Sequence, residues 1–200
     1  VASAPMFTQL VSGAGHSCGL TAGGQAYCWG FNSHGTLGVG DSTTRWQPTQ
    51  VAGALTFTQL AAGLYHTCGI SGTGETWCWG YNALGQLGTG DSVTSVVPKL
   101  VPTGALTFVR LAAGANHTCG LTGAGTAYCW GNNFRGQLGD GTNQDHASPA
   151  TPVGSGMAFT QITAGRRHSC GIATNGTAYC WGDDEVGALG DDSALVNKNA

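Results

Sequence analysis

The stretch that decides the fold runs from residue 65 to residue 80 and reads YHTCGISGTGETWCWG. It places two short apolar and aromatic runs on either side of a glycine-rich turn, a pattern typical of a β-hairpin. Related stretches occur at residues 15–30, 116–131 and 167–182, each with two cysteines ten positions apart. Successive cysteine pairs follow one another after 50, 51 and 51 residues. A fixed period of this length indicates a propeller, a solenoid or an array.

Two further blocks repeat with the hairpin. An FTQL-type block precedes each copy, and its alternation of apolar and polar residues is that of a strand. A G-x-L-G block follows each copy and contains too much glycine for a helix interior. The sequence therefore predicts an all-β fold made of one repeat-only domain, 1–200. Its four units are expected at about 1–50, 51–101, 102–152 and 153–200.

The composition excludes several classes of function. Seven Lys and Arg against ten Asp and Glu give a net charge of −3, with no basic stripe of the kind that nucleic-acid binding needs. No run of 18 apolar residues is present, so we expect no membrane insertion. The H-E-x-x-H motif is missing from the sequence, and G-x-S-x-G occurs only at residues 15–19, inside the repeated cysteine segment. We therefore expect no enzyme activity, no catalytic residue, no bound metal and no cofactor.

The cysteines of each unit lie opposite one another in the predicted hairpin. Cys18 and Cys28 are symmetric about Gly23 at the centre of the turn, which brings their β-carbons close to disulfide distance. Zinc binding, with His16 as a third ligand, and free buried thiols are the alternatives; zinc lacks a C-x2-C knuckle and a repeated fourth ligand. Disulfides would indicate an oxidising compartment, hence a secreted or cell-surface protein. The predicted bridges are Cys18–Cys28, Cys68–Cys78, Cys119–Cys129 and Cys170–Cys180.

Other repeated residues are interpreted as structural. A catalytic histidine occurs once, whereas the histidine before each cysteine pair recurs in all four units, so each is expected to make the same hydrogen bond. The tryptophan after each second cysteine is expected to pack between neighbouring sheets. The aspartates that follow the G-x-L-G blocks fit turn chemistry, because no calcium-loop pattern surrounds them. The histidines are His16, His66, His117 and His168, and the tryptophans are Trp29, Trp79, Trp130 and Trp181.

Positions that differ between the units are where specificity would lie. Trp46 and Tyr65 are predicted interaction anchors, because aromatic residues are enriched at interfaces. Arg166 and Arg167 are predicted to face the acidic run 183–185 and to belong to the same interaction loops. Two glycosylation sequons are also present, of which the second lies in a hairpin turn and is the more accessible. Their asparagines are Asn116 and Asn175.

At this point the units resemble a known family. The segments 63–70 (GLYHTCGI) and 79–90 (WGYNALGQLGTG) are similar to the regulator of chromosome condensation repeat. The resemblance covers all four units and implies a β-propeller with one four-stranded blade per repeat. Such propellers usually have seven blades, whereas this sequence holds about four. The four blades would belong to a larger propeller, close as a small ring, or continue head to tail into an array.

The resemblance leaves function open, because one fold hosts many activities. The nuclear member of the family is a nucleotide exchange factor, but the paired cysteines resemble an extracellular branch. We therefore expect a non-enzymatic extracellular propeller that serves as a structural or protein-interaction module. Its partners would be proteins, including copies of itself, with glycans at the sequons. The alternative is a secreted inhibitor or ligand-binding propeller that acts on a single protein partner.

Overall fold

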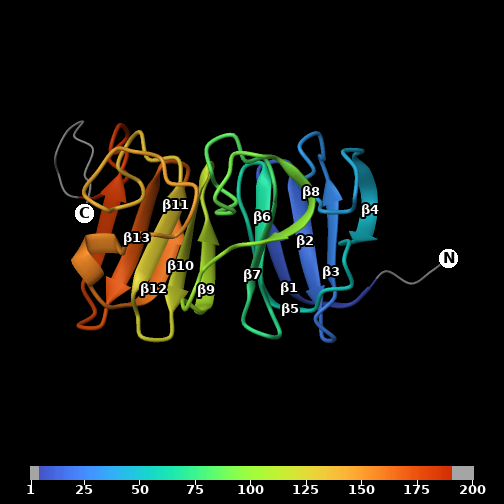
Figure 1. Cartoon of the computed structure of the whole chain (residues 1–200), viewed down its shortest axis with the longest axis horizontal. Helices are drawn as coiled ribbons and strands as arrows, with labels where there is room; N and C mark the ends of the chain where they lie inside the picture. The colour runs from blue at the N-terminus through green and yellow to red at the C-terminus, as the bar shows by residue number, and fades with distance from the viewer. Residues whose placement is uncertain (1–4, 191–200) are drawn as a thin grey trace.

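The computed structural model describes residues 5–190, which form four antiparallel sheets in a row (Figure 1). The first two sheets have four strands each, and the third and fourth have three. The strands of the first sheet are β1 (Phe7–Ser12), β2 (His16–Thr21), β3 (Ala26–Gly30) and β4 (Arg45–Gln50), and those of the second are β5 (Phe57–Ala62), β6 (His66–Ser71), β7 (Thr76–Gly80) and β8 (Ser95–Leu100). The third has β9 (Phe108–Ala113), β10 (His117–Thr122) and β11 (Ala127–Gly131), and the fourth has β12 (Phe159–Ala164), β13 (His168–Ala173) and β14 (Ala178–Gly182).

Each sheet is one blade of a propeller, so the predicted all-β propeller of about four blades is confirmed. One blade falls within each predicted repeat, while the exact repeat boundaries remain a prediction. In the third blade, isolated bridges join Tyr128 to Pro152 and Gly131 to His146 where the first two blades have a fourth strand. A short 3-10 turn, η1 (Val153–Gly156), follows them. The C-terminal part of the fourth repeat, 191–200, lies outside the described residues.

The central hairpin of each blade brings its two cysteines together. In the first blade Gly24 adopts a φ of +79° and its N–H donates to the Thr21 carbonyl at 2.9 Å, which closes the turn. The register then pairs Cys18 directly with Cys28. The same pairing produces a disulfide in every blade, with Cα–Cα distances of 4.0–4.1 Å. No cysteine of the described chain is left free, so no thiolate remains for a zinc ion.

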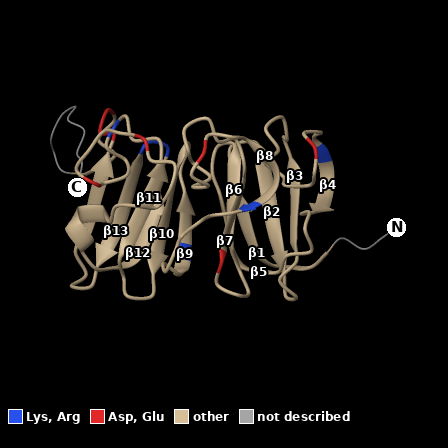
Figure 2. Cartoon of the chain, viewed as in Figure 1, with Lys and Arg blue, Asp and Glu red and all other residues tan. Residues whose placement is uncertain are grey.

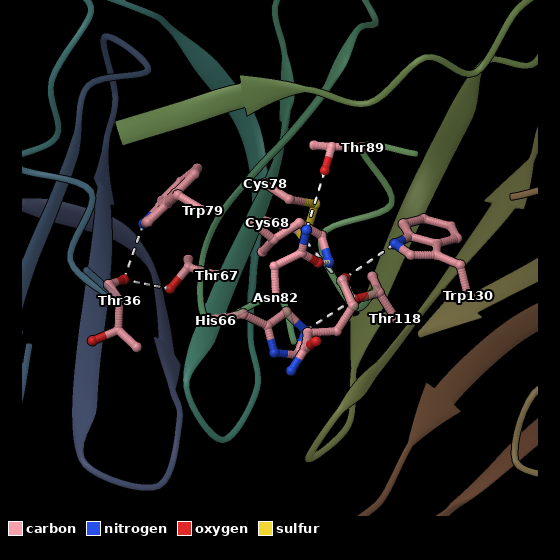
Figure 3. Close-up of a disulfide and its surroundings, with 12 residues drawn as sticks. Thr36, His66, Thr67, Cys68, Cys78, Trp79, Asn82, Thr89, Thr118 and Trp130 are labelled. Atoms are coloured by element: carbon pink, nitrogen blue, oxygen red, sulfur yellow. Dashed lines mark hydrogen bonds between the residues drawn. A yellow bond between two sulfur atoms is a disulfide. The ribbon is translucent and has the colours of Figure 1, made fainter. Parts of the chain in front are cut away.

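Neighbouring blades are joined by one hydrogen-bond pattern that repeats along the chain. Between the second and third blades, His66 Nε2 lies 2.9 Å from Thr118 Oγ1, which donates to the Gln86 carbonyl at 2.8 Å (Figure 3). Trp130 Nε1 donates to the same carbonyl at 3.1 Å. Equivalent bonds join the other two blade pairs, so the predicted shared hydrogen bond is present for His16, His66 and His117 but not, within the described residues, for His168. They link His16 to Thr67 and His117 to Ser169.

The core lies between the blades, and tryptophan fills it. Trp130 is fully buried and belongs to one hydrophobic cluster with Leu87 of the preceding blade. Gly88 lies so close that a β-carbon there would sit 2.5 Å from Trp130 Nε1. Trp79 and Trp181 occupy equivalent clusters, which confirms the predicted packing between sheets. Trp29 in the first blade is only partly buried, because the described chain has no blade before it.

The four blades form an open row. Substantial contacts between blades run from β1 to β5, from β5 to β9 and from β9 to β12, which makes these the inner strands. The first and fourth sheets lie at opposite ends of the molecule (Figure 1). The alternative of a closed four-bladed ring is therefore wrong for the described residues, because no contact of this extent joins the first blade to the fourth.

The contact between Gly88 and Trp130 predicts a graded effect of adding a methyl group. Gly88→Ala should lower the free energy of unfolding by more than about 2 kcal/mol, because it combines a positive φ of +73° with a clash against a buried ring. Gly90→Ala is the matched control: its φ is +82°, but nothing lies within 4 Å of the added carbon. The control should lower the free energy of unfolding by only about 1 kcal/mol. Equal losses in urea denaturation would contradict the packing argument.

The disulfides predict a second stability change. Replacing both Cys68 and Cys78 with alanine removes a cross-link that closes a short loop, and the chain-entropy model gives a loss of up to about 2.7 kcal/mol. The measurement is urea denaturation of both proteins without reductant. An unchanged midpoint would show that the hairpin is equally ordered in the unfolded chain with and without the bridge.

Candidate functional site

The two ends of the blades differ in character. Hairpin turns form one end, and the loops between β3 and β4 and their equivalents form the other, together with the short turns that precede β2, β6, β10 and β13. We call this second end the loop face. Most charged side chains gather there, while the strands between are almost uncharged (Figure 2). Because the units also differ most in these loops, the loop face is the candidate interaction site.

Buried asparagines hold the loops in place. Asn82 Oδ1 accepts from the Leu87 N–H at 2.9 Å, and its Nδ2 donates to the Asp91 carbonyl at 3.0 Å. Asn32 and Asn133 do the same for Leu37 and Leu138. The Asp91 carboxylate accepts the Val93 N–H at 3.0 Å, and this backbone hydrogen bond, followed by that from Thr89, lowers the Asp91 pKa. The loop aspartates thus act in turns, as expected, and the loops are preformed.

An aromatic sector occupies the loop face of the first two blades. It consists of Phe31, His34, Tyr65 and Tyr81. The His34 ring lies 5.1 Å from Tyr65 and 4.9 Å from Tyr81, between ring centroids. Phe31 packs 6.0 Å from Tyr65 and is 42% exposed. These rings present an amphipathic surface with little side-chain freedom left to lose, which suits protein recognition.

A charged sector occupies the loop face of the last two blades. Arg167 Nη1 lies 3.5 Å from Asp183 Oδ2 and 3.8 Å from Glu185 Oε2. Arg135 reaches the same two carboxylates at 4.0 and 3.9 Å. Its guanidinium also lies over the Phe134 ring, 5.5 Å from the centroid, and that ring is 70% exposed. The fourth blade thus combines paired charges with an exposed apolar neighbour.

The four expected interaction residues are distributed over the molecule. Tyr65 and Arg167 lie in the aromatic and charged sectors, and Arg167 faces the acidic run as predicted. Arg166 is exposed and lines a shallow hollow at the inner strand ends. Trp46 is 92% exposed but lies on β4, the outermost strand of the first blade. Their role in binding remains a prediction.

Sequence reasoning missed five contributors to these sectors. All lie in variable segments, and none was singled out: Phe31, His34, Tyr81, Phe134 and Arg135. The signal for the aromatic sector was present, because Phe31 and Tyr81 occupy the same position of consecutive units. Its joining to Tyr65 through His34 depends on how adjacent blades meet, which spacing along one unit does not reveal.

The buried histidines His16, His66 and His117 lie out of reach of an external substrate. His66 and Thr118 superficially resemble a base and a nucleophile, with 2.9 Å between Nε2 and Oγ1. Both are fully buried, however. Burial lowers the pKa of His66 to about 3, so the ring is neutral at physiological pH. Within residues 5–190, no group of three metal-ligating side chains lies close enough to hold an ion, and no helix is long and apolar enough to cross a membrane.

The two sequons lie in different surroundings. Asn175 is exposed in the β13–β14 turn, where its Oδ1 accepts the Thr177 N–H at 3.0 Å. Asn116 is partly buried on the loop face, and Gln86 Nε2 donates to its Oδ1 at 3.4 Å. Glycosylation at either position remains a prediction, and Asn175 is sterically the more open of the two.

The blades, their shared interface and the preformed loops define a β-propeller repeat protein. One family model of the regulator of chromosome condensation (RCC1) repeat matches residues 7–36, 57–86, 108–137 and 159–188. A second model of the same repeat matches residues 23–70, 73–121 and 124–172. The chain therefore belongs to the RCC1 repeat family. This confirms the resemblance drawn from the hairpin and G-x-L-G motifs.

Two relatives are similar to most of this chain. The chain is 32% identical over 185 residues to the ultraviolet-B receptor UVR8 of Arabidopsis thaliana, covering 90% of this chain and 42% of that protein. It is 39% identical to the protein RCC2 homolog of Danio rerio, covering 92% of this chain and 28% of that protein. The chain thus spans less than half the length of these relatives.

Solved structures show the same fold. Human WBSCR16 superposes with a TM-score of 0.87 at 23% identity, over 98% of this chain and 52% of that one. Yeast RCC1 (Prp20), in a structure bound to Kap60, gives 0.87 at 24% identity, over 100% and 49%. The ectodomain of the Physcomitrella patens receptor kinase CR4 gives 0.60 at 27% identity, over 89% and 39%.

The buried histidines predict a loss of stability in mild acid. Burial lowers the pKa of His66 to about 3 and that of His16 and His117 to about 4, against 6.5 in the unfolded chain. The unfolded chain therefore binds protons first as pH falls, so the stability is full above pH 6.5 and declines below it. By about pH 4.5 the free energy of unfolding should fall by on the order of 2 kcal/mol per histidine.

Urea denaturation between about pH 7 and 4.5 checks this expectation. His66→Gln should be less stable than the parent at neutral pH, because it loses the bond to Thr118, yet it should lose less stability on acidification. An identical pH slope for both proteins would show that His66 is not the group that titrates.

Proposed function

We propose that this protein is a non-enzymatic, extracellular structural or protein-interaction module that binds through its loop face and assembles with copies of itself. The observation that carries the proposal is the contrast between the contacts that join the blades and the residues of the loop face. The contacts between blades are nearly uniform, whereas the loop face divides into an aromatic and a charged sector. A uniform scaffold beneath a varied face is what a recognition module needs.

Protein binding is supported by the chemistry of the face. The aromatic sector offers ring faces and hydroxyls with few rotatable bonds, and the charged sector offers paired carboxylates and guanidinium groups. The family also supplies a precedent, since yeast RCC1 has been seen bound to Kap60. A hollow beside the charged sector is lined by Arg167, Asp183 and Glu185 among others, whereas the hollow at the inner strand ends is lined mainly by glycine and alanine.

An extracellular location is supported by the cysteines. Four disulfides that use all eight cysteines are typical of secreted or surface-exposed proteins, because reducing compartments keep thiols free. A receptor-kinase ectodomain is among the structures with this fold. Glycans at Asn116 and Asn175 would fit the same location, if the host glycosylates.

A second candidate function is a secreted inhibitor or ligand-binding propeller that acts on one protein partner. The observation that favours it is the asymmetry of the loop face. Side chains of opposite character lie on its two halves, so a partner would bind in a single orientation. In this function the face would act alone, without assembly.

The loop face is tested by retention of proteins from the extracellular fraction of the source cells on the immobilised chain. The double variant Tyr65→Ala/Tyr81→Ala removes two rings of the aromatic sector. It should lower the affinity for a genuine partner by about tenfold or more. Thr73→Ala/Glu75→Ala at the hairpin end is the matched control and should bind like the parent. A partner whose affinity is unchanged by the loop-face variant, or lost equally in the control, would contradict the proposal.

A further inference from the structure

The inner strands of neighbouring blades are joined by a glutamine bridge that recurs along the chain. Gln59 Nε2 donates to the Leu111 carbonyl at 3.3 Å, and Gln59 Oε1 accepts the Leu111 N–H at 3.0 Å. Gln9 makes the same pair of bonds to Leu60, at 3.3 and 3.0 Å. The side-chain amide thus supplies one donor and one acceptor to two backbone groups that point away from their own sheet.

The contact between the third and fourth blades breaks this pattern. Arg110 occupies the glutamine position on β9, where its side chain is exposed and makes no hydrogen bond or ion pair within residues 5–190. Ile162 is the residue that a glutamine would bridge. It pairs with Gly171 in the register in which Leu111 pairs with Gly120, so its N–H also points away from its sheet. An arginine has donors only, so no side chain of the described chain accepts this N–H.

A hollow of about 290 Å³ opens over this unbridged boundary. Its lining residues come from the inner strands β5, β9 and β12 and are Gln59, Arg110, Leu111, Thr160, Gln161 and Ile162. Arg110 and Ile162 therefore open onto the same space. Both blades of this boundary are present, so the missing bridge does not depend on where the described chain begins or ends.

The inner wall around this hollow is positively charged. We use the term inner wall for the inner strands and the turns that follow them, 7–15, 57–65, 108–116 and 159–167. These segments contain three arginines and no lysine, aspartate or glutamate. Arg167 is paired with the acidic run 183–185, whereas Arg110 and Arg166 have no ion pair among the described residues. The arginine of β9 stands as an isolated charge (Figure 2), and no carboxylate of the inner wall competes for it.

We propose that Arg110 and the Ile162 N–H form a binding site for a carboxylate group on the inner wall. One carboxylate oxygen would accept the Ile162 N–H, as Gln59 Oε1 accepts that of Leu111, and the guanidinium would donate to the carboxylate. The guanidinium has several N–H donors, so it can also serve the Ile162 carbonyl, the second group that a glutamine would bridge. A charge-assisted contact of this kind is stronger than one between neutral groups.

A carboxylate suits this site because it is planar and has the size of the amide that bridges the other boundaries. The carboxylate can belong to a small organic acid or to an acidic side chain of a protein segment, since the chemistry of recognition is the same. The site goes beyond the proposed function, because it lies on the inner wall and does not use the aromatic or the charged sector.

Amide NMR of the isotope-labelled chain, titrated with sodium acetate at constant ionic strength, tests the site. Acetate should shift the Ile162 N–H resonance downfield until it saturates, because this N–H gains a charged acceptor. Sodium chloride is the control titration and should give no saturable shift. An Ile162 N–H that does not respond to acetate, or that responds equally to chloride, would overturn the site.

Substitutions at Arg110 give a sharper test. Arg110→Gln restores the residue that the other blades carry, so the chain should fold, and the new amide should occupy the Ile162 N–H and abolish the response to acetate. Arg110→Lys keeps the charge without the planar fork and should bind acetate about tenfold more weakly. Arg166→Gln is the matched control, because it removes the other unpaired arginine of the inner wall and should respond like the parent. An Arg110→Gln protein that responds like the parent would contradict the proposal.

Two further probes distinguish the sources of the carboxylate. One is succinate, and the other is a capped tripeptide with a central glutamate, compared with its glutamine counterpart. A half-maximal shift of the Ile162 resonance at a lower concentration of the glutamate peptide than of acetate or succinate would identify a protein segment as the source. The reverse order would identify a small organic acid. Equal responses to the glutamate and glutamine peptides would show that no carboxylate is needed and would remove the site.

The loop face and the carboxylate site are read separately in these experiments. The double variant Tyr65→Ala/Tyr81→Ala leaves the inner wall unchanged and should respond to acetate like the parent. Arg110→Gln leaves the aromatic sector unchanged and should keep the binding of a protein partner that uses those two tyrosines. Failure of either site would therefore leave the conclusion about the other in place.

Discussion

The structure depends on one carbonyl group per blade boundary. At the contact between the second and third blades, the Gln86 carbonyl accepts both the Thr118 hydroxyl and the Trp130 indole, while His66 holds the same hydroxyl from the other side. All of these groups are buried, so each would cost free energy if it lost its partner. The indole can come this close only because Gly88 has no side chain. Polar bonding therefore sets the spacing between blades, and the apolar cluster fills what remains.

This arrangement explains why stability and recognition are separated in the molecule. The inter-blade contacts take their residues from strands and from the buried side of the G-x-L-G loops, which vary little among the units. The outer sides of the same loops are anchored by Asn32, Asn82 and Asn133 and are free to differ. A change such as tyrosine to aspartate at the position of Tyr81 and Asp183 thus alters the surface without disturbing the core.

The stacking also gives the chain a direction. Each blade directs its histidine toward the following blade, and its hydroxyl and indole toward the preceding one. The two ends of a row of such blades therefore carry complementary groups. His168 and Trp29 are those ends here. Their partial exposure, against the full burial of the same residues inside the row, follows from the absence of a neighbouring blade in the described residues.

The sequence alone determined the repeat, the all-β class, the hairpins and the pairing of Cys18 with Cys28, because these depend on contacts within about ten residues of each other. It also indicated that four equivalent histidines have a structural role. The tertiary structure decided what the sequence could not. The joining of Tyr65 to His34, the meeting of Arg135 with Asp183 and the open row all arise between residues of different units. Their positions depend on how each blade packs against the next, through contacts such as those at the Gln86 carbonyl and Trp130, and this packing has no signature in the spacing of any single repeat.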